Sequence, residues 1–68
     1  MSSRYNQSFS LFEARSYFGL TQDEVGSIVG VARGTLSHLE RGTRNSPNPV
    51  VAARIDTFRS MANILANR

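Results

Sequence analysis

Three glycines, each placed directly after a stretch with helical periodicity, constrain this chain more than any other feature. Gly19, Gly30 and Gly42 follow segments in which apolar residues recur at spacings of three and four. Glycine at such a point commonly ends a helix, because it adopts a left-handed conformation without steric cost. We therefore expect short helices joined by tight turns. At Gly30 the next helix can begin within about three residues and cross the one before it.

Capping residues indicate where the first two helices begin. Ser8 or Ser10 can cap a helix that ends at Gly19. Thr21 is followed three residues later by Glu24, which is the spacing of a capping box. This pattern predicts a second helix over residues 22–29. Its predicted buried residues are Val25, Ile28 and Val29.

The segment 32–41 is predicted to be a helix with two different sides. Leu36 and Leu39 form its apolar side, which should face the core. The opposite side consists of small or polar residues, namely Arg33, Gly34, Ser37, His38 and Arg41. We expect this second side to be exposed.

A longer helix is predicted over residues 49–68. Pro49 suits a first helical turn, and no glycine or proline follows it. The apolar residues of this helix cover an arc of roughly 140°, which is wider than a two-residue coiled-coil seam. Part of the arc is therefore expected to face a second copy of the chain. The residues assigned to this homodimer interface are Val51, Ile55, Phe58, Ala62 and Leu65.

The chain has 68 residues, of which 40% are hydrophobic, and this supports one small packed domain. Residues 1–7 show no apolar periodicity and are expected to form a flexible N-terminal arm, followed by a single domain over residues 8–68. With no cysteine and one histidine, a metal site is not expected, and neither is a cofactor or a small-molecule ligand.

The basic residues point to the kind of partner. All eight are arginine, against five acidic residues, and the net charge of +3 suits a polyanion. No apolar run approaches the roughly 20 residues that would cross a bilayer, so no membrane partner is expected. The expected location is the cytoplasm.

The segment GLTQDEVGSIVGVARGTLSHLERGTRN, residues 19–45, resembles the Cro and phage-repressor (XRE-like) helix-turn-helix family. The matching features are Gln22, the small residue Gly26, the turn residue Gly30, the apolar Leu36 and Leu39, and the closing ERG. The resemblance implies an all-α, repressor-like domain of four or five helices. It also implies that Gln22 binds a DNA phosphate, for which a helix N-terminus is physically suited. A further implication is an ion pair between Arg15 and Glu40, since neither charge is stable alone near an apolar face.

The resemblance implies binding to double-stranded DNA at the nucleoid of a bacterial or phage-infected cell, with the 32–41 helix in the major groove. Arg33 can donate two hydrogen bonds to guanine, and Ala32 can touch a thymine methyl group. The expected base-reading residues are Ala32, Arg33, Gly34, Ser37 and His38. The expected phosphate-binding residues are Thr21, Gln22, Thr35, Arg41, Thr43, Arg44 and Asn45.

Two residues depart from the family pattern. Ala32 stands where many relatives carry a hydroxyl, so the 32–41 helix should be weakly capped. Gly34 stands where a base-reading side chain is often found, at a cost to the helix of about 1 kcal/mol relative to alanine. Either the helix backbone lies unusually close to DNA at Gly34, or specificity is carried elsewhere.

The expected function is that of a sequence-specific transcription regulator, a repressor that binds a near-palindromic operator as a homodimer. An enzyme is not expected, because Ser37 and His38 are helical neighbours that point about 100° apart and lack a third partner. The alternative is a protein-binding adaptor on the same fold, antitoxin-like or associated with anti-defence. The sequence leaves open the operator, the regulated gene, and the choice between repression and activation.

Overall fold

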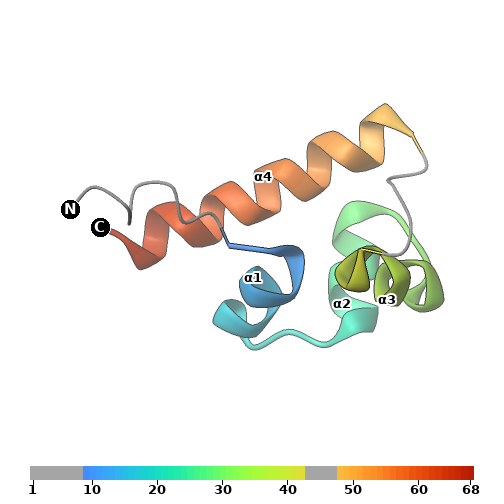
Figure 1. Ribbon diagram of the computed structural model, residues 1–68, viewed down its shortest axis with the longest axis horizontal. Coiled ribbons are helices and arrows are strands. Elements are labelled where there is room, and N and C mark those ends of the chain that lie inside the picture. Colours follow the sequence, from blue (N-terminus) through green and yellow to red (C-terminus); the bar gives the residue numbers. More distant parts are fainter. Residues whose placement is uncertain (1–8, 43–47) are drawn as a thin grey trace.

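Four α-helices make up the described part of the chain, residues 9–42 and 48–68 of a computed structural model. They are α1 (Leu11–Phe18), α2 (Gln22–Val29), α3 (Arg33–Arg41) and α4 (Pro49–Ala66). Figure 1 shows α4 running the length of the molecule, with the three short helices on one side of it. α1 and α2 pack against α4, while α3 packs against α2 and α1. The predicted all-α fold is confirmed, whereas the predicted arm over residues 1–7 lies outside the described residues.

The helix boundaries follow from local hydrogen bonds. The Ser10 hydroxyl accepts from the Glu13 N–H at 3.0 Å, and the Glu13 carboxylate accepts from the Ser10 N–H at 2.9 Å. Thr21 and Glu24 form the same capping box at the start of α2, as predicted. Of the two serines considered for α1, Ser10 is the cap, and Ser8 is not among the described residues. The three predicted helix-ending glycines all have positive φ: Gly19 at 70°, Gly30 at 91° and Gly42 at 74°.

The ends of α3 and α4 differ slightly from the prediction. Ala32 is the N-cap of α3 and provides no side-chain hydrogen bond, which agrees with the weak cap expected there. The Asn48 side chain caps α4 by accepting from the Val51 N–H at 2.9 Å. α4 ends at Ala66 and not at Arg68.

A single apolar core joins the four helices. Its buried residues are Leu11, Ala14, Val25, Val29, Leu36, Val51, Ile55, Phe58 and Ala62. Leu36 is fully buried, and Leu39 packs against the core from its edge. The prediction that Ile28 is buried is wrong, because its side chain is 50% exposed. α4 covers the side of α2 that carries Val25 and Val29, and Ile28 lies at the border of that side.

The core also corrects the assignment of a dimer interface to α4. Val51, Ile55, Phe58 and Ala62 are buried within a single chain, where α1 and α2 cover them. Only Leu65 of the predicted interface residues keeps substantial exposure, at 36%. The three short helices cannot enclose a core without a fourth element. They therefore pack against the apolar arc of α4, part of which was expected to face a second copy of the chain.

Gly26 allows the tight turn between α2 and α3. It is buried, and its carbonyl accepts from the N–H groups of Gly30 at 2.7 Å and Val31 at 2.9 Å. A methyl group added at position 26 would lie 2.6 Å from the Val31 carbonyl oxygen. Because this oxygen belongs to the backbone, relieving the contact requires the turn itself to move.

Gly26→Ala is expected to lower the free energy of unfolding by about 1 to 3 kcal/mol, as overpacking does in a well-packed core. The clash outweighs the gain of about 1 kcal/mol that alanine brings as a better helix former. Thermal denaturation followed by circular dichroism measures the change. Ser27→Ala, at the exposed neighbouring position in α2, is the control and should be neutral or slightly stabilising. Equal stability of the two variants would contradict a close contact in the turn.

Candidate nucleic-acid interface

α3 presents one side to the core and the other to solvent. Leu36 anchors it with a fully buried side chain. Thr35 and Ser37 are half-buried. The remaining residues of the predicted contact side are exposed: Ala32, Arg33, Gly34, His38 and Arg41. In the described part of the chain, therefore, neither α4 nor a loop covers this side of α3.

An ion pair fixes the C-terminal half of α3 to α1. The Arg15 Nε lies 2.5 Å from Oε2 of Glu40, and Nη2 donates to Oε1 at 3.2 Å. The Glu40 side chain is only 6% exposed and that of Arg15 17% exposed. This is the pair that the family resemblance implies, and its two-pronged geometry restricts rotation of α3 about its own axis.

Two further contacts of Arg15 were not anticipated from the sequence. Nη1 donates to the Leu20 carbonyl oxygen at 3.1 Å, and the guanidinium lies 5.3 Å from the centre of the Phe12 ring. The i,i+3 spacing of Phe12 and Arg15 is a signal that could have predicted the second contact. Together these contacts tie the end of α1 and the start of α2 to the same group that holds α3.

Gln22, the predicted phosphate ligand, also joins this network. Its Nε2 donates to Oε1 of Glu40 at 3.1 Å. An amide group carries two donor hydrogens and a carbonyl oxygen, so one N–H remains for another acceptor. The half-buried Gln22 is the first residue of α2, where unpaired backbone N–H groups favour an anion.

Arg33 lies at the start of α3, opposite the start of α2. Its Nη1 is 3.8 Å from the Asp23 Oδ2, and both side chains are largely exposed, at 67% and 71%. This distance is too long for a hydrogen bond. An exposed pair of this kind contributes little to stability, so the Arg33 guanidinium can exchange its partner without a large penalty. The sequence alone does not predict Asp23 as a neighbour of Arg33, because the contact depends on how α2 and α3 cross.

The other predicted contact residues are placed as follows. Arg41 donates to the Ser37 hydroxyl at 3.0 Å across one turn of α3, and the hydroxyl keeps its own hydrogen as a donor. The Thr21 hydroxyl accepts from the Glu24 N–H and likewise keeps its hydrogen. The structure does not describe Thr43, Arg44 or Asn45.

Depressions flank the exposed side of α3. One, of about 630 Å³, lies between the starts of α2 and α3 and is lined by Arg15, Gly19, Leu20, Thr21, Gln22, Asp23 and Arg33. The second, of about 570 Å³, lies between α1 and α3 and is lined by Ser10, Phe12, Glu13, Arg15, Gln22, Ser37, Glu40 and Arg41. Of the predicted contact residues, these depressions are lined by Thr21, Gln22, Arg33, Ser37 and Arg41, and Gln22 borders both.

The described residues contain neither a metal-binding cluster nor a membrane-spanning helix. Residues 9–42 and 48–68 contain no group of three His, Cys, Asp or Glu side chains that could hold a metal ion. None of the described helices combines the length and apolarity needed to cross a membrane.

Comparison with known protein families gives a match over most of the chain. A family model described as a helix-turn-helix domain matches residues 10–61, which include α1, α2, α3 and α4 as far as Met61. No curated protein and no solved structure matches the chain. Because the family match spans most of the chain and agrees with the crossing of α2 and α3, the chain belongs to the helix-turn-helix domain family, which is associated with XRE-like DNA-binding regulators.

Proposed function

We propose that this protein is a transcription regulator that binds double-stranded DNA sequence-specifically and acts as a repressor. The observation that carries the proposal is the exposed side of α3, which is held in a fixed orientation by the Arg15–Glu40 pair. An exposed helix of this size fits the major groove of B-form DNA. Family membership supports DNA binding, and the resemblance of residues 19–45 to phage repressors supports repression.

The proposed base-reading residues are Ala32, Arg33, Gly34, Ser37 and His38. Arg33 has the chemistry to donate to O6 and N7 of guanine, releasing the weak contact with Asp23. The Ser37 hydroxyl can donate to a base while it accepts from Arg41. These residues occupy the first two turns of α3, the part of a recognition helix that usually reaches base edges.

A second set of residues is proposed to bind phosphates. Gln22 and Thr21 can donate from the start of α2, Thr35 and Arg41 from α3, and Thr43, Arg44 and Asn45 from the segment after it. Arg41 lies at the opposite end of α3 from Arg33, so the two cations lie at the two ends of the exposed side. Contacts of this type set the register of the protein on DNA and provide most of the salt-dependent affinity.

We propose a homodimer on a near-palindromic operator. Its interface differs from the one that the apolar arc of residues 49–68 predicts from the sequence. Apolar side chains remain exposed after the core has formed, and those of α4 are Val50, Met61, Ile64 and Leu65. A second copy of the chain that covered them would remove this surface from water. Two copies related by a two-fold axis would place their α3 helices on half-sites about one helical turn apart.

Selection of bound sequences from random duplex DNA tests the proposed function. We expect an inverted repeat with half-sites about 10 base pairs apart, centre to centre. Binding to the recovered operator should weaken with salt, with a log–log slope of about 0.9 for each neutralised phosphate. Sedimentation should show a dimer, either for the free protein at micromolar concentration or for the protein bound to the operator. Recovery of a single half-site bound by a monomer would contradict the dimer, and failure to enrich any sequence would contradict specific DNA binding.

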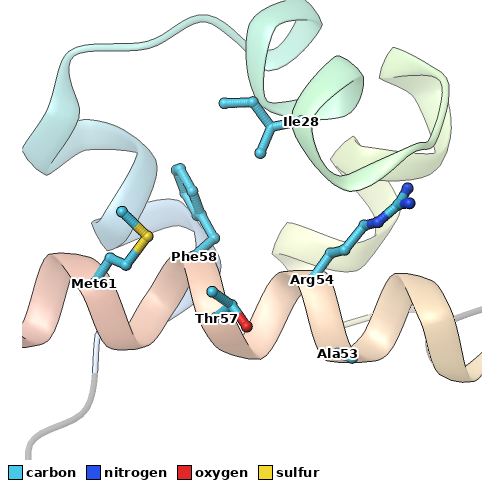
Figure 2. Close-up of a pocket in the computed structure, with 6 residues that line it drawn as sticks. All are labelled: Ile28, Ala53, Arg54, Thr57, Phe58 and Met61. Carbon is cyan, nitrogen blue, oxygen red and sulfur yellow. The ribbon is translucent and has the colours of Figure 1, made fainter.

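A protein-binding adaptor on the same fold is the second candidate. It is favoured by an apolar groove of about 280 Å³ between α2 and α4, lined by Ile28, Ala53, Arg54, Thr57, Phe58 and Met61. Figure 2 shows Ile28 pointing from α2 toward Phe58 and Met61 on α4. This groove lies near the C-terminal end of α2, whereas the proposed phosphate contacts are at its N-terminal end. An adaptor would show no sequence selection on DNA, and its binding would depend on groove residues and not on Arg33.

A further inference from the structure

Gly34 is the one glycine of the described chain whose presence the fold does not explain. Three of the others end helices with positive φ, and Gly26 contacts the Val31 carbonyl oxygen closely. Gly34 lies within α3 and is not among the glycines with positive φ. A methyl group built at this position meets no atom within 4 Å in the described part of the molecule. Glycine is nevertheless among the least favourable residues in a helix.

The position of Gly34 on α3 indicates that the glycine serves contact with a partner. It lies three residues before Ser37, four before His38 and seven before Arg41, so these residues share one side of the helix. Arg33 precedes it and extends from the same exposed end of α3. A rigid partner that contacts Arg33 and His38 together must pass over Gly34, which lies between them around the helix. The missing side chain there lets such a partner reach the helix backbone.

We propose that Gly34 is a specificity-determining position at which the base edges of DNA come into contact with the backbone of α3. This inference rests on the proposed function. Glycine increases the depth to which the start of α3 enters the major groove, because any Cβ atom would hold the helix away from the bases. The role of Gly34 is therefore steric. The absence of a side chain strengthens binding in the complex with DNA, whereas it lowers the stability of the free protein.

Gly34→Ala separates these two effects because they have opposite signs. The free protein should become more stable, with Tm rising by about 4 °C, because alanine is the better helix former and has open space around it. Affinity for the selected operator should nevertheless fall about tenfold or more. Gly34→Leu should lower affinity further while keeping the protein folded. Tm from circular dichroism and Kd from fluorescence anisotropy are the two measurements.

Ser60→Ala is the matched control, because it improves helix propensity at an exposed position of α4, away from α3. It should raise Tm slightly and leave the operator Kd unchanged, which shows that added stability alone does not weaken binding. A duplex of random sequence is the second probe, and Gly34→Ala should bind it as the wild type does.

Three outcomes would have distinct meanings. If Gly34→Ala binds the operator as tightly as the wild type, the close approach is refuted. If it weakens binding to operator and random duplex by the same factor, the contact is with the sugar–phosphate backbone, and the assignment to base edges is overturned. If the wild type selects no operator at all, the proposed function fails first, and that result is distinguishable because it is obtained before any variant is compared.

Discussion

Glu40→Ala is expected to lower the free energy of unfolding by about 3 kcal/mol, at the lower end of the range for breaking a buried ion pair. The substitution leaves the Arg15 guanidinium, with a side chain only 17% exposed, without its carboxylate. It also removes the acceptor for the Gln22 amide. The Leu20 carbonyl and the Phe12 ring still stabilise the Arg15 cation in this variant, so we do not expect a loss at the upper end of the range. Small domains often have only about 5 kcal/mol of total stability, so this variant should be close to unfolding at room temperature.

Urea denaturation followed by circular dichroism measures the loss of stability in Glu40→Ala. Two further variants test whether the buried ion pair causes it. Asp56→Ala removes an exposed carboxylate 4.0 Å from Arg59 and should cost less than about 0.5 kcal/mol. The double variant Arg15→Met with Glu40→Leu replaces both charges with apolar groups and should recover much of the loss. If Glu40→Ala costs no more than Asp56→Ala, the network around Glu40 does not hold α3 in place.

Arg33→Ala is expected to weaken binding to the selected operator by about 1 to 3 kcal/mol per half-site and to relax the base preference at one position of each half-site. The physical reason is the loss of two hydrogen bonds to one guanine, for which no other group at the start of α3 can substitute. The fold should be unaffected, because the Arg33 side chain is 67% exposed and its contact with Asp23 is weak. A repeat of the sequence selection with the variant, together with its operator Kd, measures both effects.

Arg68→Ala is the matched control for Arg33→Ala, because it removes the same charge from an exposed residue beyond the end of α4. It should leave base preference unchanged and alter affinity only slightly. If Arg33→Ala weakens binding to every duplex by the same factor, Arg33 contacts phosphate and does not read a base. If neither binding nor selection changes, the proposed role of Arg33 is wrong and the adaptor function gains support.

The buried side of α4 limits where the proposed dimer interface can lie. Val51, Ile55, Phe58 and Ala62 cannot serve both the core and an interface, because a side chain buried by α1 and α2 has no surface left for a partner. Of the exposed apolar residues of α4, Val50 lies near its start, and Met61, Ile64 and Leu65 lie in its last two turns. A partner copy would therefore contact α4 beside the core and not over it.

The sequence was sufficient for features set by residues close together in the chain. The ends of α1, α2 and α3 at their glycines, and the capping box of Thr21 and Glu24, depend on hydrogen bonds within four residues. The same holds for the division of α3 into an apolar and a polar side, because helical geometry places Gly34 and His38, each two residues from Leu36, on the other side of the helix. The pair of Arg15 and Glu40 joins residues 25 positions apart, and only the resemblance to a family made it predictable.

What the tertiary structure decided is which sides of the helices meet. A helical projection places Ile28 near Val25 and Val29, yet the angle at which α4 crosses α2 buries two of these residues and leaves Ile28 half-exposed. That crossing also converts a presumed interface on α4 into core, and the crossing of α2 and α3 brings Asp23 beside Arg33. Local sequence sets each helix and its polarity through short-range hydrogen bonds and side-chain spacing. Burial depends on long-range packing, in which every apolar side competes for a limited number of covering helices.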